Sequence, residues 1–108
     1  MNLYQVKNNK EYIFNIGDLV KDVESRQKIS MELLKELSKD RKIAVYTEQP
    51  TQGYFAFCKD DHKIFMDYEL TKGDSPFNLN QAKIKGLKVS TNNPQDLDPI
   101  NQILQKYI

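Results

Sequence analysis

Hydrophobic and polar residues alternate at the start of the chain, over residues 3–7 and again over residues 11–15. A period of two is that of a pleated strand, whose successive side chains point to opposite faces of a sheet. Asn8 and Asn9 lie between the two stretches, and Asn tolerates the positive φ values that a tight turn requires. The pattern therefore predicts a short hairpin.

A helical period replaces the alternation after Gly17. Asp18 can cap the first helical turn through its side-chain oxygen. Residues 25–28 are polar throughout, so two alternatives stay open: one long helix over about residues 18–39, or two shorter helices that meet near Ser25. The hydrophobic positions of this stretch are Leu19, Val20, Val23, Leu33, Leu34 and Leu37.

Three further strands are predicted over residues 43–48, 54–58 and 63–70, joined by turns into an antiparallel meander. On the last strand, one face carries Ile64, Met66, Tyr68 and Leu70. Its other face carries Lys63, Phe65, Asp67 and Glu69. A sheet with one apolar and one polar face is covered on the first side and exposed to solvent on the second.

The last part of the chain is predicted to contain one more strand and one more helix. Residues 75–85 have a weak apolar pattern, so a short helix and a loop both stay open. Residues 87–90 are a candidate strand. A final helix over about residues 98–107 begins where Asp98 supplies a cap and Pro99 suits the first turn. Its apolar face consists of Ile100, Ile103, Leu104 and Tyr107.

These elements predict an α+β fold in a single domain over residues 1–108. The length suits one domain, and the 39% of hydrophobic residues suffice for one core. The apolar faces of both helices need a partner, which the strand over residues 63–70 can supply. We therefore expect an antiparallel sheet of four to six strands, with the long helix and the C-terminal helix packed on one face.

Positive and negative charges are nearly balanced along the chain. The chain contains 16 Lys or Arg residues and 15 Asp or Glu residues. Residues 18–42 contain seven basic and six acidic side chains. A protein that binds nucleic acid mainly through phosphates usually has a basic excess, so nucleic acid is not the favoured partner. No apolar stretch approaches the roughly 20 residues of a membrane-spanning helix. The single cysteine, Cys58, cannot form an internal disulfide, which favours a cytoplasmic protein.

No catalytic, metal-binding or cofactor-binding set stands out. His62 is the only histidine and follows Cys58 in a stretch that also contains Asp60 and Asp61. A zinc site uses three or four such ligands, and a cysteine nucleophile needs a base within hydrogen-bond distance. A polar hairpin turn explains the same residues with fewer demands. We therefore expect no enzymatic activity, no cofactor and no metal.

The order of elements over residues 18–58 resembles that of a winged helix-turn-helix. Two helical stretches around a polar turn would be followed by a two-stranded wing. In such motifs the exposed start of the second helix reads base edges. The resemblance implies a DNA-binding regulator, which we keep as the alternative function. Its base-contacting residues would be Arg26, Gln27, Lys28 and Ser30.

The favoured function is a small, non-enzymatic binding or regulatory module that acts on a macromolecular partner, in the first place a protein. The predicted strands carry more aromatic residues than a small core must use, and Tyr is enriched at protein interfaces. Usage rich in Lys, Asn and Ile is typical of AT-rich genomes, and phages and mobile elements encode small accessory proteins of this kind. The sequence does not indicate the oligomeric state. The candidate contact residues are Tyr46, Tyr54, Phe55 and Phe65.

Overall fold

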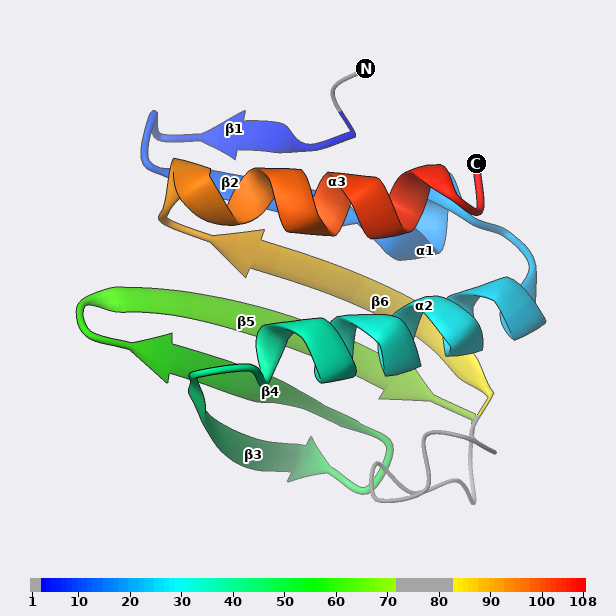
Figure 1. Cartoon of the computed structure of the whole chain (residues 1–108). Coiled ribbons are helices and arrows are strands. Elements are labelled where there is room, and N and C mark those ends of the chain that lie inside the picture. The colour runs from blue at the N-terminus through cyan, green and yellow to red at the C-terminus, as the bar shows by residue number, and fades with distance from the viewer. Residues whose placement is uncertain (1–2, 72–82) are drawn as a thin grey trace.

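Six strands form one antiparallel sheet in the computed structural model, which describes residues 3–71 and 83–108 (Figure 1). The strands are β1 (Gln5–Lys7), β2 (Glu11–Asn15), β3 (Lys42–Gln49), β4 (Gln52–Lys59), β5 (His62–Leu70) and β6 (Ile84–Thr91). Their order across the sheet is β1-β2-β6-β5-β4-β3. The β1–β2 hairpin and the meander from β3 to β6 therefore join where β2 pairs with β6. This arrangement confirms the predicted α+β class.

The turns between the strands use residues that tolerate positive φ. Asn8 and Asn9 adopt φ values of 55° and 57°, and the backbone N–H of Lys10 donates to the carbonyl of Lys7 at 3.2 Å. Asp60 adopts a φ of 54° between β4 and β5. Asn and Asp reach this region at lower cost than other non-glycine residues. The predicted hairpin turn over Asn8 and Asn9 is confirmed.

The helical region after β2 is divided, and the division lies before Ser25. The short helix α1 (Ile16–Leu19) ends at Val20, whose backbone is extended, and α2 (Val23–Leu37) begins after Asp22. Asp22 is the cap, since its carboxylate accepts from the backbone N–H of Ser25 at 3.0 Å and from its hydroxyl at 2.7 Å. The prediction that Asp18 caps the long helix is therefore wrong.

The C-terminal helix begins slightly earlier than predicted. A short 3₁₀ turn, η2 (Pro94–Asp96), leads directly into α3 (Leu97–Gln105), so Asp98 lies inside the first turn and does not cap it. Asp96 precedes α3, and its carboxylate accepts from Arg41 Nη2 at 2.9 Å and from the Thr91 hydroxyl at 3.2 Å. This buried carboxylate ties together the connection between α2 and β3, the end of β6 and the start of α3.

The last strand is longer than its sequence pattern indicates. It spans Ile84 to Thr91, whereas alternation predicted only residues 87–90. Most of residues 75–85, for which helix and loop both stayed open, lies outside the described residues. Ile84 and Lys85 belong to β6, so a helix that reaches residue 85 is ruled out.

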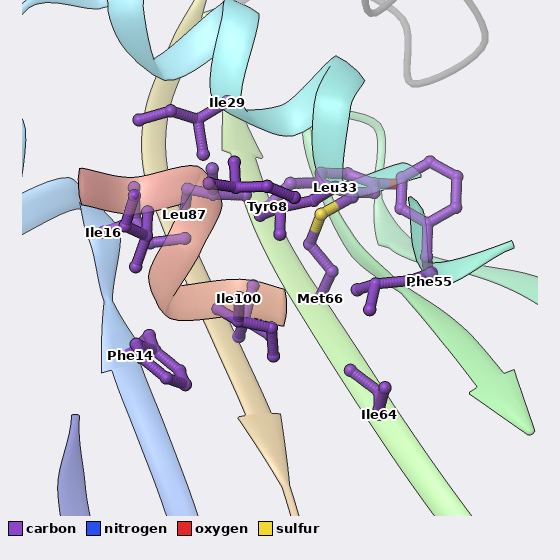
Figure 2. Packing of buried hydrophobic residues seen from close by; sticks show 14 of the residues in the cluster. Phe14, Ile16, Ile29, Leu33, Phe55, Ile64, Met66, Tyr68, Leu87 and Ile100 are labelled. Atoms are coloured by element: carbon purple, nitrogen blue, oxygen red, sulfur yellow. The ribbon is translucent and has the colours of Figure 1, made fainter. Parts of the chain in front are cut away.

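The core lies between the sheet and the helices, all on one side of the sheet (Figure 1). Figure 2 shows side chains of α2 and α3 meeting those of β2, β5 and β6 in this layer. Burial of each large aliphatic side chain contributes about 1.5–3 kcal/mol, so this layer is the main source of stability. Fully buried members include Phe14, Ile29, Leu33, Met66, Val89, Ile100 and Leu104.

Candidate functional site

The two faces of the sheet have different surroundings. Both long helices lie on the same side, in front of the sheet in Figure 1. The face turned away from them carries the alternate residues of each strand, which pair from β3 across to β2. Among residues 3–71 and 83–108, no helix lies against this face, and we call it the uncovered face. A functional site is expected where side chains are not needed for the core, and this face of the sheet meets that condition.

Three rings of the uncovered face form a chain of contacts, with Tyr54 in the middle. Tyr46 of β3 stacks on Tyr54 of β4, with ring centroids 4.8 Å apart and an interplanar angle of 24°. Tyr54 meets Phe65 of β5 edge-on, with centroids 5.7 Å apart. Tyr46 is 51% exposed, and the other two are half-buried. These three residues form what we call the aromatic cluster.

Strand register and small neighbours position the aromatic cluster. Tyr46 lies directly opposite Tyr54 in the β3–β4 ladder, which is the arrangement that lets two cross-strand rings stack. Ala56 lies between Ala44 and Phe65 in the next row of the sheet. Ala56 is only 5% exposed although it lies on the uncovered face, because large neighbours shield it. The rings therefore adjoin two small apolar side chains in the neighbouring row.

Charged residues of both signs surround the aromatic cluster. Asp67 of β5 lies directly opposite Tyr54, and Lys88 of β6 lies opposite Asp67. Partial burial raises the pKa of the Asp67 carboxyl, and the nearby carboxylates of Glu48 and Glu11 raise it further, while Lys88 opposes the shift. Several carboxylates therefore lie close together on the side of the cluster next to Asp67, which we call its acidic side.

A shallow cavity of about 320 Å³ opens beside the aromatic cluster on this acidic side. Its polar wall includes Glu48, Gln52, Asp67, Glu69 and Lys88. Among the described residues, no group of three or more His, Cys, Asp or Glu side chains is placed to hold a metal ion. The cavity therefore offers hydrogen bonds and charge to a ligand group, without a metal-binding geometry.

The structure brings together three of the four predicted contact residues. Phe55 lies on the opposite face of β4, is only 7% exposed and contacts Tyr68 at a centroid distance of 5.6 Å. It belongs to the core (Figure 2). Tyr46, Tyr54 and Phe65 remain as the surface group.

The four residues expected to read DNA do not share an exposed surface. Arg26 and Ser30 face the core side of α2 and are 8% and 0% exposed. The Arg26 guanidinium donates to the carbonyl of Val20 at 3.2 Å, and the Ser30 hydroxyl donates to the carbonyl of Gln27 at 2.7 Å. Lys28 is exposed and pairs with Glu24. The four-residue α1 also makes a first helix far shorter than the resemblance implies.

Cys58 and His62 lie on opposite faces of the sheet. Cys58 of β4 pairs with Lys63 of β5, and both lie on the uncovered face. His62 pairs with Lys59, the residue after Cys58, and successive residues of a strand point to opposite faces. His62 Nδ1 is hydrogen-bonded to Asn93 Nδ2 at 2.6 Å, and so supports the turn before α3. The geometry does not place His62 as a base for the Cys58 thiol.

One feature of β3 has no counterpart among the predicted site residues. Ile43 and Val45 are 47% and 39% exposed on the helix side of the sheet, beyond the reach of α2. The uninterrupted apolar run over residues 43–46 is the sequence signal for it. Such a run is typical of a strand covered on both faces, yet β3 lies at the edge of the sheet.

Comparison of the chain with protein-family models, with curated proteins and with solved structures found no significant match. In the part of the chain that the structure describes, no helix has the length and apolar character needed to cross a membrane. The geometry of the uncovered face is therefore the basis for a functional proposal.

Proposed function

We propose that this protein is a non-enzymatic, cytoplasmic binding module that holds a protein partner against the uncovered face of its sheet. The observation that carries the proposal is the aromatic cluster. Tyr54 contacts both Tyr46 and Phe65 on the side of the sheet opposite the core. Aromatic side chains supply large contact areas with few rotatable bonds, so they lose little conformational entropy on binding.

The charges around the aromatic cluster favour a protein over a nucleic acid. Asp67 adjoins Tyr54, and Glu48 and Glu69 line the same cavity. Phosphate groups that follow stacked bases would approach these carboxylates and be repelled. An apolar centre with a rim of both signs, by contrast, is the usual composition of a protein–protein interface.

Capture from a native lysate of the source cells tests the proposal. The immobilised parent protein is compared with the Tyr46→Ala/Phe65→Ala double variant, and the captured material is separated into protein and nucleic acid. The control is Met31→Ala, which removes a 41% exposed side chain from the helix side. Circular dichroism first establishes that all three proteins are folded.

We expect the parent and the Met31→Ala control to retain the same protein, and the double variant to retain at least about tenfold less, as for loss of interface anchors. Equal retention by the folded double variant would contradict the proposal. Capture of nucleic acid in place of a protein would contradict it as well.

A further inference from the structure

The outer edge strand β3 is exposed on both of its faces. Ile43 and Val45 are open to solvent on the helix side, and Tyr46 is open on the other. In the part of the chain that the structure describes, β3 pairs only with β4. Three of the eight large hydrophobic side chains that are exposed there fall on this one strand, over residues 43–46.

The two edges of the sheet are protected to different degrees. The edge strand β1 has only three residues, and very short edge strands discourage pairing with another chain. β3 has eight residues, and none from Ile43 to Thr47 is charged. A long, apolar and uncharged edge is the kind that binds another strand.

Some backbone N–H and C=O groups of β3 point outward from the sheet, away from β4. The carbonyl of Tyr46 points at Gly53 of β4, where an added Cβ would meet it. Carbonyl directions alternate along a strand, so the N–H and C=O groups of Val45 point away from β4. These groups are directed toward the position that a seventh strand would occupy.

The sequence of β3 is complementary to itself when it is reversed about Val45. We propose that β3 pairs antiparallel with β3 of a second copy of this chain, around a two-fold axis at Val45. The register of β3 is regular from Lys42 to Thr47, and an irregularity between Thr47 and Gln49 leaves Glu48 as an extra residue on this strand. Lys42 of one copy then lies at the same end of the interface as Glu48 of the other, and these two long side chains of opposite charge can reach each other at both ends. Ile43 opposes Thr47, and Ala44 opposes Tyr46.

The pairing also extends the surface that carries the aromatic cluster. A two-fold axis normal to the sheet keeps the helices of both copies on one side and both clusters on the other. Tyr46 of each copy then lies beside Ala44 of its partner, which leaves room for the ring. The dimer requires no change in the fold, and a symmetric interface of this kind uses one patch twice.

Sedimentation of the purified protein over about two decades of concentration tests the pairing, because dimerisation follows mass action. The parent is expected to form a dimer. Lys42→Glu or Glu48→Lys alone brings like charges together at both ends and should weaken the dimer at least about tenfold. The Lys42→Glu/Glu48→Lys double variant restores opposite charges and should recover it. Lys10→Glu, at the β1–β2 turn, is the control and should leave the dimer unchanged.

Cysteine cross-linking fixes the register, in a Cys58→Ser background. Val45→Cys places two thiols across the axis and should give a disulfide-linked dimer on mild oxidation, since the Cα atoms of paired residues lie within disulfide range. Ile43→Cys faces Thr47 and should not cross-link. A monomeric parent at every concentration would overturn the proposal, as would a dimer that neither charge variant weakens. Sedimentation and cross-linking use the purified chain alone, so failure of the dimer proposal can be told apart from failure of the proposed partner binding.

Discussion

Gly53 of β4 occupies a position that has no room for a side chain. An added Cβ would collide with the carbonyl of Tyr46 and would lie 2.6 Å from the hydroxyl of Tyr68. Gly86 of β6 is a matched strand glycine, where the nearest atom would be the Cβ of Glu69 at 3.5 Å. Both glycines are paired within the sheet, so they differ mainly in the space that is open to an added side chain.

Gly53→Ala is therefore expected to lower the free energy of unfolding by about 1–3 kcal/mol, the usual range for overpacking. Gly86→Ala should change it by less than about 1 kcal/mol, because only the backbone preference changes. Urea unfolding of both variants measures the difference. Equal losses at the two positions would show that the space around Gly53 is not limiting.

Glu32 of α2 joins the two long helices. Its carboxylate accepts from the hydroxyl of Tyr107 and, at 2.9 Å, from Lys106 Nζ. The hydrogen bond from Tyr107, followed by that from Lys106, lowers the pKa of Glu32 below its ordinary value of 4.5, and the bond to Glu32 raises the pKa of Tyr107 above 10.0. A depressed carboxyl pKa stabilises the fold above pH 4.5, and this contribution is lost as the pH falls through the folded value.

Glu32→Gln should consequently destabilise the protein at pH 7, by no more than about 1 kcal/mol because solvent screens the group. The difference between variant and parent should shrink as the pH is lowered below 4.5. Urea midpoints at pH 7 and at progressively lower pH measure it. A penalty that stays constant across this range would show that charge on Glu32 contributes nothing.

The caps show which residues local chemistry can and cannot predict. Asp18 and Asp22 are both suited to begin a helix, and the sequence favoured the first. The structure selects Asp22 because the chain is extended at Val20, whose side chain is buried and whose carbonyl accepts from the buried Arg26 at 3.2 Å. Burial of this kind depends on contacts distant in sequence, and no local pattern carries it.

At the scale of elements, α3 depends on the sheet for its stability. Nine residues are too few to remain helical alone in water, so docking must supply the stability. Leu104 is 0% exposed within that contact. Leu104→Ala should cost about 2–5 kcal/mol, as for other large-to-small core substitutions. Thermal unfolding measures it, with the exposed Gln102→Ala as control. A loss below 1 kcal/mol would mean that α3 is not part of the core.

Strands and helices followed from their periods, but strand order did not. Alternation located the hairpin and the meander, and the helical period located α2 and α3. The β1–β2 hairpin pairs with β6 at one end of the meander, so β3, at the other end of the meander, is an edge strand of the sheet. That pairing joins residues far apart in sequence, so the exposure of Ile43 and Val45 could not be predicted.

The candidate site was predictable in part for a similar reason. In residues 54–57, which read Tyr-Phe-Ala-Phe, hydrophobic side chains occupy successive positions. Alternation therefore could not decide whether Tyr54 or Phe55 faces the core. Residue type identified the aromatic side chains as candidates. The helices cover one face of the sheet, and this decides which of the aromatic side chains remain at the surface.

At the scale of the molecule, the two faces of the sheet differ in composition, and we propose that only the uncovered one binds a partner. The helix side holds the buried core, and the uncovered side holds the aromatic cluster and its charged rim. The proposed contact between a protein partner and this uncovered face can be tested residue by residue, by adding the captured protein to the ¹⁵N-labelled chain and recording amide NMR shifts.

The largest changes are expected in β3, β4 and β5, around Tyr46, Tyr54 and Phe65, with α2 and α3 almost unaffected. The interface backbone of pre-organised complexes moves little, so the shifts report contact directly. Shifts confined to α2 and α3, with the three aromatic positions unchanged, would contradict the assignment of the uncovered face as the partner-binding surface.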